Sequence, residues 1–293
     1  MRGPSWLIPA STWRRESLRA SSLACAIAMC CASVLTAGDA RASTGGSRLA
    51  REHASRAAPY PMGVFDLKEP SYFAPPAANA MPGYTRSYVD DFTQQLSPSQ
   101  WFYFRGIPQG DPSGRFDKAH VAVTHGVLKI GTWRDPRFSD QWVSGGVGLY
   151  GMATTYGAYF VRSRETAPGP DTTELLWPLN NQWPPEIDFN EAGESTWAQS
   201  WFVHYTNPQD QLLGSNTIDI LHWHTWGVIW TPASITFTVD GRVWGTVTAS
   251  YAIPNIPMNL DLQSQSWCGI TGEPCPTADS VLLVDWVAQY TPS

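Results

Sequence analysis

Charged residues are scarce in this sequence: they make up 15% of its 293 positions, and basic residues are the rarer kind, with 19 Lys and Arg against 25 Asp and Glu. The chain contains no basic patch with interleaved aromatic residues, the pattern typical of nucleic-acid-binding surfaces. We therefore expect no nucleic-acid partner. Aromatic residues are plentiful at 13%, which suits an exported protein with one sizeable domain.

The chain also lacks an apolar run of the roughly 20 residues that a membrane-spanning helix needs. Its small-residue apolar stretch, residues 20–35, is interrupted by serines, follows Arg14, Arg15 and Arg19, and precedes an A-x-A motif at residues 40–42. These features predict a signal peptide over residues 1–42 and a secreted, extracellular protein without membrane contact after its removal. The Arg14-Arg15 pair leaves open whether export follows the general or the twin-arginine route.

Cysteine is rare as well, with five in the chain, three of which lie in the predicted signal peptide. The remaining two, Cys268 and Cys275, are seven residues apart. In an exported chain an even pair of this kind predicts a local disulfide rather than two free thiols. Removing residues 1–42 also takes five of the 19 basic and two of the 25 acidic residues, which leaves a net charge of −9.

Amphipathic helices and internal repeats are missing, and from residue 87 onward the pattern is nearly all strand. Short β-rich runs cover residues 121–130, 142–150, 159–163, 173–177, 200–205, 225–230, 235–239, 243–247, 258–262 and 281–290. Turn-forming residues separate them, among them the two-residue hairpin signal Asp240-Gly241, and Gly145-Gly146 predicts a bulge or bend. Many short strands of this kind predict an all-β, antiparallel sandwich.

Residues 43–86 are scattered with Pro, Ala and Gly and show no sustained periodicity, which is typical of a linker or unstructured arm. Phe65, Tyr72 and Phe73 make the segment too aromatic for a plain spacer, so docking of this arm on the domain surface stays open. The sequence therefore predicts a signal peptide over 1–42, an arm over 43–86 and one sandwich domain over 87–293.

The most informative segment is Glu186-Ile187-Asp188-Phe189-Asn190-Glu191. In an extended strand alternate side chains share a face, so Glu186 and Asp188 point the same way, whereas strict alternation turns Glu191 away. One extra residue, a β-bulge around Phe189-Asn190, returns Glu191 to the face of the other two acids. Three crowded acids repel one another, which favours a catalytic role over the plainer alternative of solvated surface acids.

This segment resembles the catalytic strand of glycoside hydrolase family 16, whose motif is E-x-D-x-E or, with a bulge, E-x-D-x-x-E. Further segments resemble the family in the same order, at residues 126–130, 156–164, 175–178, 202–205, 224–232, 239–241 and 284–290. The resemblance thus extends from about residue 87 to the C-terminus. It implies that residues 87–293 form a catalytic domain with a concave, concanavalin A-like β-jelly-roll of two antiparallel sheets. It also implies an open cleft for a polysaccharide substrate, and we expect the protein to be a monomer.

The acids themselves indicate the chemistry. Retaining glycosidases need two carboxyl groups about 5–5.5 Å apart, and two Glu side chains that lean together from one bulged strand can reach this distance. The resemblance assigns Glu186 as the nucleophile and Glu191 as the general acid/base. It assigns Asp188 as the partner that orients Glu186 and raises the pKa of Glu191. We expect this catalysis to require no cofactor.

Sugar binding is expected to rest on side chains near the motif, because flat aromatic faces match the C–H face of a β-linked sugar. His204 resembles a cleft histidine of the family, and an ordinary core histidine is the alternative. Trp201 is a further candidate for sugar binding, with packing in the core as an equal alternative. For Arg162 the alternative to sugar binding is a surface salt bridge. The predicted substrate-binding residues are Trp177, Trp183, His204, Arg162, Gln263, Gln265 and Trp267.

One metal ion is implied by the resemblance alone: a structural calcium held by an Asp of the final strand and by backbone carbonyls near the N-terminal strand. Asp285 occupies the matching position in the final strand, and Gly126 offers a carbonyl. Oxygen ligands of this kind suit calcium. The alternative is a buried Asp whose carboxylate accepts backbone N–H hydrogen bonds.

These observations favour a retaining, endo-acting hydrolase of β-1,3- or mixed β-1,3/1,4-glucan. Two alternatives stay open: an enzyme of the same fold that cleaves a galactan such as agar or carrageenan or transfers glycosyl groups, and a carbohydrate-binding lectin without turnover. The presence of both Glu186 and Glu191 argues against the lectin, because binding alone needs no acid/base pair.

Overall fold

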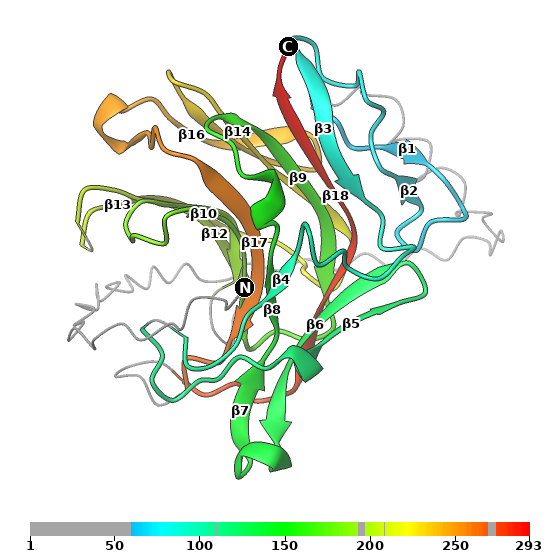
Figure 1. Cartoon of the computed structure of the whole chain (residues 1–293), viewed down its shortest axis with the longest axis vertical. Coiled ribbons are helices and arrows are strands. Elements are labelled where there is room, and N and C mark those ends of the chain that lie inside the picture. The colour runs from blue at the N-terminus through cyan, green and yellow to red at the C-terminus, as the bar shows by residue number, and fades with distance from the viewer. Residues whose placement is uncertain (1–59, 109, 193–196, 208, 269–273) are drawn as a thin grey trace, which may run out of the picture. The chain divides into compact units, whose positions relative to one another are not determined.

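The computed structural model describes residues 60–108, 110–192, 197–207, 209–268 and 274–293. The predicted signal peptide and residues 43–59 lie outside the described residues. Within these ranges the regular secondary structure is nearly all strand, and two large antiparallel sheets hold most of these strands (Figure 1). No helix in these ranges is long and apolar enough to cross a membrane.

The first large sheet has seven strands. In spatial order they are β13 (Gln211–Thr217), β12 (Ala198–His204), β11 (Glu186–Ala192), β10 (Asp171–Pro178), β17 (Met258–Gln265), β8 (Gly146–Gly148) and β4 (Phe102–Tyr103).

The second large sheet has nine strands. Its path runs β16 (Arg242–Val247), β15 (Ile235–Val239), β14 (His224–Trp230), β9 (Gly157–Glu165), β18 (Ser280–Pro292), β6 (Val127–Asp135) and β5 (Val121–Thr124), with β3 (Tyr84–Asp90) paired to β18 and β7 (Gln141–Ser144) paired to β6. A two-stranded sheet, β1 (Val64–Phe65) and β2 (Phe73–Ala74), precedes them. Four 3₁₀ turns are described, η1 (Lys118–His120), η2 (Pro136–Phe138), η3 (Tyr150–Met152) and η4 (Ser250–Ala252).

The hydrophobic core lies between the inner faces of the two large sheets. Ile187 and Phe189 of β11 are fully buried there together with Val161 of β9 and Phe237 of β15. Trp201 of β12 stacks on Phe237 with ring centroids 4.7 Å apart, so this tryptophan packs against the core. The predicted all-β antiparallel sandwich is therefore confirmed.

Two predicted runs turn out to be pairs of strands. The run over 121–130 divides into β5 and β6 at His125 and Gly126, whose φ angles of 53° and 71° reverse the chain. The run over 142–150 breaks at Gly145, after which the chain changes sheets: β7 pairs with β6, and β8 pairs with β17. The glycine pair thus marks a crossover between sheets, a larger change than the predicted bend.

The hairpin predicted at Asp240-Gly241 is present. These two residues have φ angles of 48° and 72° and connect β15 to β16, as a two-residue turn with both residues left-handed requires. Sequence patterning missed β13 because its residues, QLLGSNT, are mostly exposed and include glycine and polar side chains. Only Leu212 and Gly214 of this edge strand are half-buried, so its alternation is too short to stand out in the sequence.

The arm, from Tyr60 to β3, lies on the outer face of the nine-stranded sheet, where Figure 1 places β1 and β2 beside β3 and β18. Trp286 Nε1 donates a hydrogen bond to the carbonyl of Phe73 at 2.9 Å, and the Tyr290 hydroxyl donates one to the carbonyl of Ala77 at 2.9 Å. Phe73 in turn covers the guanidinium of Arg162 at 4.6 Å. This part of the arm is thus folded onto the domain.

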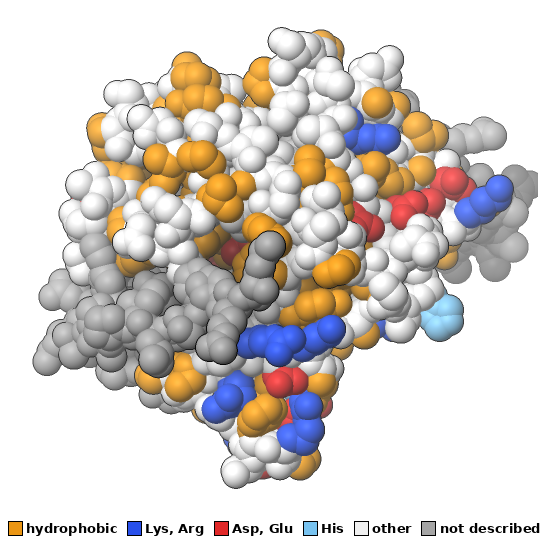
Figure 2. Space-filling model, viewed as in Figure 1, with side chains coloured by type: hydrophobic (Ala, Val, Ile, Leu, Met, Phe, Trp, Pro, Cys, Tyr) orange, Lys and Arg blue, Asp and Glu red, His pale blue; other side chains and the backbone are white. Residues whose placement is uncertain are grey.

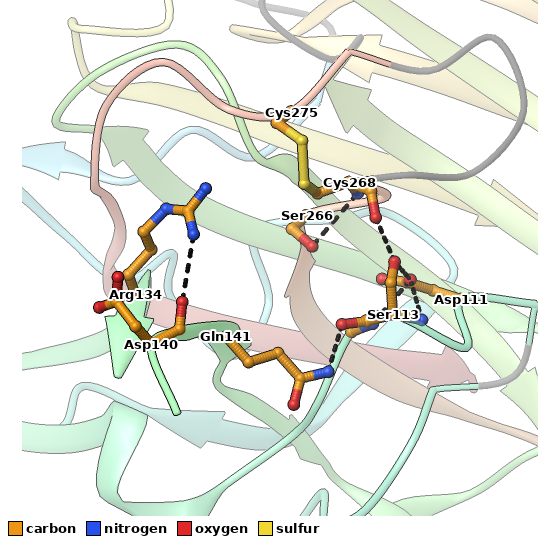
Figure 3. The surroundings of a disulfide bond; sticks show 9 residues. Asp111, Ser113, Arg134, Asp140, Gln141, Ser266, Cys268 and Cys275 are labelled. Carbon is orange, nitrogen blue, oxygen red and sulfur yellow. Dashed lines mark hydrogen bonds between the residues drawn. A yellow bond between two sulfur atoms is a disulfide. The ribbon is translucent and has the colours of Figure 1, made fainter. Parts of the chain in front are cut away.

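The predicted disulfide between Cys268 and Cys275 is present (Figure 3). The hydroxyl of Ser113 donates a hydrogen bond to the Cys268 carbonyl, and Gln141 Nε2 donates one to the Ser113 carbonyl. The disulfide therefore lies where the end of β17 meets the loop that precedes η1.

Basic side chains have acidic neighbours on the hairpin of β6 and β7. Arg137 pairs with Asp135 and Asp117 there, and the space-filling view shows blue side chains beside red ones at the foot of the molecule (Figure 2). The charge of Arg137 is thus compensated by its two acidic neighbours.

Candidate active site

The acidic motif forms β11, and its predicted bulge is present. On the β10 side, Asp188 pairs with Leu175 and Glu191 pairs with Thr173, so three residues of β11 span what two residues of β10 span. Leu175 and Thr173 are two positions apart and share a face, and directly paired residues also share a face. Glu191 is thereby returned to the face of Asp188, the outer face of the seven-stranded sheet, while Phe189 enters the core.

Glu186 and Asp188 lie in a network of close polar contacts. The indole N–H of Trp183 donates a hydrogen bond to Glu186 Oε2 at 2.5 Å. On β12, His204 is the register partner of Glu186, and its Nε2 is 3.5 Å from Asp188 Oδ2. Ligand atoms of Glu186, Asp188 and His204 lie within 4.8 Å of one another, a spacing that would also admit a metal ion.

The electrostatics of the site are dominated by burial and by crowding of acids. Burial first, and then the charge of Asp188 and its hydrogen bond, raise the pKa of Glu186 to about 8. The nearby His204 and the Trp183 N–H oppose this rise, because both stabilise the ionised carboxylate. Near neutral pH, Glu186 and Asp188 therefore hold a proton between them in the absence of substrate.

Several predicted sugar-binding residues share the outer face with the acids. Trp177 of β10 is half-buried, and its Nε1 donates to Asn181 Oδ1 at 2.7 Å. On β17, Gln263 pairs with Thr173, the residue opposite Glu191, and Gln265 pairs with Asp171. Both glutamines therefore face the same side as the acids, as the alternation of the strand predicts.

Trp267 follows the end of β17 with a left-handed φ of 47° and is half-buried. A Cβ added to Gly110 would lie 3.2 Å from its ring, so a glycine there makes room for the indole. Trp267 thus lies against the loop that also contacts the disulfide.

Arg162 does not belong to this site, and its prediction as a substrate-binding residue is wrong. It is a buried residue of β9 in the nine-stranded sheet, where it donates to Thr225 Oγ1 at 3.2 Å and lies 3.6 Å from Asp240 Oδ1. Its guanidinium is covered by Phe73 of the arm. The alternation that buries Val161 in the core turns Arg162 outward on the opposite side of the sandwich from the acids.

Asp285 lies in the final strand β18, fully buried, and its Oδ2 accepts hydrogen bonds from the Ser71 backbone N–H at 3.1 Å and from the Ser71 hydroxyl. Its Oδ1 is buried without a hydrogen-bond partner among the described residues. A Cβ on Gly126 would lie 4.0 Å from the Asp91 carbonyl oxygen, so two backbone segments meet near Gly126. An unsatisfied carboxylate oxygen in such surroundings fits calcium, which prefers oxygen ligands.

Sequence patterning missed two polar residues of β17, Asn259 and Asp261. Asn259 pairs with Trp177, and Asp261 pairs with Leu175, whose partner on β11 is Asp188. Both side chains therefore share the outer face with the acids. Asn259 and Asp261 alternate along β17 with Gln263 and Gln265, so the sequence could have placed all four on one face. Only the order of the strands, however, brings that face near Glu186.

Comparison of sequences finds one family over much of the chain. The family described as "Glycosyl hydrolases family 16" matches residues 151–288, a span that contains the acidic strand, His204 and β17. No curated protein matches the chain.

Solved structures with the same architecture include several laminarinases. The laminarinase catalytic domain of Thermotoga maritima MSB8 has a TM-score of 0.62 at 15% identity, over 72% of this chain and 99% of that one. The laminarinase of Rhodothermus marinus has a TM-score of 0.62 at 21% identity, over 71% and 97%. A LamA variant from Z. galactanivorans, in complex with laminaritriose and laminaritetraose, has a TM-score of 0.61 at 19% identity, over 71% and 99%. At these identities the likeness shows the fold.

Proposed function

The chain belongs to the glycosyl hydrolases family 16 and is a glycosidase with a β-jelly-roll fold, and from this premise we propose that it is a retaining, endo-acting hydrolase of β-1,3- or mixed β-1,3/1,4-glucan. The observation that carries the proposal is the bulge at Phe189-Asn190, which places Glu191 on the face of Glu186 and Asp188. A bulge re-aims one side chain at some cost to strand pairing, and such features concentrate beside active sites.

In the first step, an oxygen of the Glu186 carboxylate attacks the anomeric carbon while Glu191 gives its proton to the departing glycosidic oxygen. The bond from carbon to that oxygen breaks, and a covalent glycosyl-enzyme forms. In the second step, Glu191 takes a proton from water, the water oxygen attacks the same carbon, and the bond to Glu186 breaks. Glu191 ends protonated and Glu186 ends ionised, so the enzyme is regenerated.

Asp188 and His204 manage the proton that Glu186 must lose before it attacks. With the pKa of Glu186 raised to about 8 by burial and by Asp188, the resting pair holds a proton, and attack requires that this proton resides on Asp188. His204, 3.5 Å from Asp188 Oδ2, stabilises negative charge on the pair. Trp183 stabilises the ionised form of Glu186 directly through its N–H.

We propose a β-glucan as the substrate because aromatic and amide side chains accompany the acids on the outer face. Trp177 and Trp183 offer flat apolar surfaces to the C–H faces of sugar rings, and Gln263 and Gln265 offer donors and acceptors to their hydroxyls. The similarity to solved laminarinases, and to a LamA variant in complex with laminaritriose and laminaritetraose, supports a β-1,3-linked glucan.

The test is reducing-sugar release from laminarin, lichenan, agarose and xyloglucan by the protein without residues 1–42. We expect release from laminarin or lichenan, by internal cleavage that yields oligosaccharides before glucose. Glu186→Gln and Glu191→Gln each abolish turnover without lowering the thermal unfolding temperature, because each exchange removes an acid and preserves shape. Release from agarose alone, or near-normal turnover by either variant, contradicts the proposal.

We further propose that the enzyme is exported through its N-terminal signal, acts outside the cell as a monomer and carries a structural calcium. The calcium would be held by Asp285 Oδ1, which is buried and unpartnered among the described residues, and by the Gly126 carbonyl. Such an ion would stabilise the contact between the final strand and the segment that contains Gly126. It lies on the other sheet from the acids and supplies no step of the reaction.

A further inference from the structure

Asp261 is a fourth acid on the face of the catalytic residues. It is the register partner of Leu175, and Leu175 is the register partner of Asp188, so β10 separates Asp261 from the catalytic strand. Neighbouring strands lie about 4.8 Å apart, so the backbones at Asp261 and Asp188 lie about 10 Å apart. Leu175 lies between them but is only 1% exposed, so it offers no surface of its own to a sugar. A sugar ring bound at Glu186 would instead have Asp261 at its opposite edge.

The carboxyl of Asp261 is held by one oxygen only. Asn259 Nδ2 donates a hydrogen bond to its Oδ1 at 2.5 Å, while its Oδ2 makes no hydrogen bond to any residue that the structure describes. The strand on the other side leaves room for this carboxyl, because the residue opposite is Gly148. A Cβ at Gly148 would lie 2.5 Å from Asp261 Oδ1 and 2.4 Å from Phe102 Cε1. Asp261 is thus fixed in place with one oxygen uncommitted, although only 5% of the residue is exposed.

The charge state of Asp261 follows from its surroundings. Burial first, and then the charge of Glu186, raise the pKa of Asp261 well above its ordinary value, and the hydrogen bond from Asn259 opposes this only in part. These surroundings favour the neutral form of Asp261. In that form Oδ1 accepts from Asn259 and the proton resides on Oδ2, which makes the uncommitted oxygen a hydrogen-bond donor. A buried polar group without a partner is costly, so a ligand that accepts this hydrogen bond gains affinity.

We propose that Asp261 is a specificity-determining residue that donates a hydrogen bond to a hydroxyl of the sugar lying between it and Glu186. The inference rests on the proposed glycosidase function and names a further recognition element of the same site. It also bears on the chemical class of that sugar. A sulfate or carboxylate on the sugar would lie beside the negative charge that the Glu186–Asp188 pair keeps, so the position favours an uncharged sugar.

The test is calorimetric binding of laminaritetraose to the protein without residues 1–42, in a Glu191→Gln background that prevents turnover. Asp261→Ala weakens binding by about tenfold or more, the change that corresponds to the loss of one strong hydrogen bond. Asp261→Asn stays within about threefold, because the amide is neutral, has the same shape and keeps a donor. Asp219→Asn, which changes an exposed acid beyond the end of β13, is the matched control and binds as the parent does.

A set of monodeoxy oligosaccharides separates recognition from a merely structural role. We expect one deoxy sugar of the set to bind the parent protein as weakly as the complete sugar binds Asp261→Ala. Asp261→Ala should bind that deoxy sugar and the complete sugar equally well. Equal losses by Asp261→Ala across the whole set, or unchanged binding of laminaritetraose, overturn the inference. So does an Asp261→Asn variant as weak as Asp261→Ala. Turnover of laminarin by the unmutated protein reports on the proposed function independently, so the failure of one is distinguishable from the failure of the other.

Discussion

Glu186 shows how three neighbours set the behaviour of one carboxyl. Burial and the charge of Asp188 favour its neutral form, whereas His204 and the Trp183 N–H favour its ionised form. The balance leaves its pKa at about 8. A nucleophile must be ionised to attack, so Asp188 affects catalysis mainly through the pH at which Glu186 gives up its proton.

Replacement of Asp188 tests this relation. Asp188→Asn removes a negative neighbour and weakens the hydrogen bond that stabilises neutral Glu186, so the pKa of Glu186 falls. The acidic limb of the profile of kcat/KM against pH therefore moves to lower pH by about 1 unit or more, while kcat falls because the nucleophile is less well oriented. The measurement is the pH profile of laminarin hydrolysis, with Asp219→Asn as the control. An acidic limb that stays in place or moves to higher pH contradicts this role of Asp188.

The sequence predicted those site residues that lie close together along the chain, and it missed those that only the order of the strands brings together. Glu186, Asp188 and Glu191 lie within six positions of one strand, and alternation with one bulge suffices to place them on one face. Asp261 escaped prediction because it approaches Glu186 only through the strand order β11–β10–β17, which no local pattern encodes. Arg162 was misplaced for the same reason, since the sequence of β9 does not reveal to which sheet the strand belongs.

Among the elements, β9 and β10 carry a pair of buried acids from opposite sheets. Glu165 of β9 accepts a hydrogen bond from the Thr172 hydroxyl, and Glu174 of β10 accepts one from the Ser163 hydroxyl. Burial raises the pKa of Glu165 to about 8, and it raises the pKa of Glu174 well above its ordinary value. Near pH 7 the Glu165 carboxyl is therefore mostly neutral in the folded protein and ionised in the unfolded chain, and burial favours the neutral form of Glu174 as well.

This difference makes stability depend on pH. When the folded-state pKa of an acid lies above its unfolded-state value, its contribution to the free energy of unfolding is complete below about pH 4.5. That contribution is lost as the pH rises to about 8. For Glu165 the loss amounts to up to about 5 kcal/mol. Glu165→Gln removes this contribution, so its free energy of unfolding in urea falls less between pH 5 and pH 8 than that of the unmutated protein. Asp279→Asn, at an exposed site, keeps the original slope. If the free energy of unfolding of Glu165→Gln falls with pH as steeply as that of the unmutated protein, the raised pKa of Glu165 is contradicted.

Element patterns were readable wherever a strand has one buried face. The strands β14, β15 and β18 were predicted nearly in full because their alternating apolar residues fill the core. By contrast, β13 is a largely exposed edge strand in which only Leu212 packs against the core, so its signal is weak. The change of sheet at Gly145 was invisible as well, because a glycine pair permits a bend, a bulge or a crossover alike.

At the scale of the whole molecule, the arm and the acids occupy different sheets. The arm contacts β9 and β18 through Phe73 and Ser71, whereas the acids occupy the outer face of the seven-stranded sheet. Docking of the arm was left open by a sequence rich in Pro and Ala, because the partners of its aromatic residues come from strands more than 80 residues away.

Calcium is expected to act on the stability of the whole domain. An ion bound to the folded state alone, at a hundredfold excess over its Kd, adds about 2.7 kcal/mol to the free energy of unfolding. Calcium added after treatment with a chelator therefore raises the Tm of the unmutated protein. Asp285→Asn, which removes the proposed ligand, abolishes this response, while Asp219→Asn retains it. A Tm that is indifferent to calcium in the unmutated protein rejects the calcium site and leaves the catalytic assignment untouched.

The central claim is that Glu186 and Glu191, brought to one face by a single bulge, act as nucleophile and acid/base. Its most direct test is the stereochemistry of the first-formed product, followed by proton NMR during early hydrolysis of a β-glucan before mutarotation mixes the anomers. Attack by Glu186 and then by water inverts the anomeric carbon twice, so the account predicts that the β-anomer of the new reducing end appears first. Initial appearance of the α-anomer would mean a single displacement by water between carboxyl groups about 6.5–9.5 Å apart, and it would contradict the nucleophilic role of Glu186.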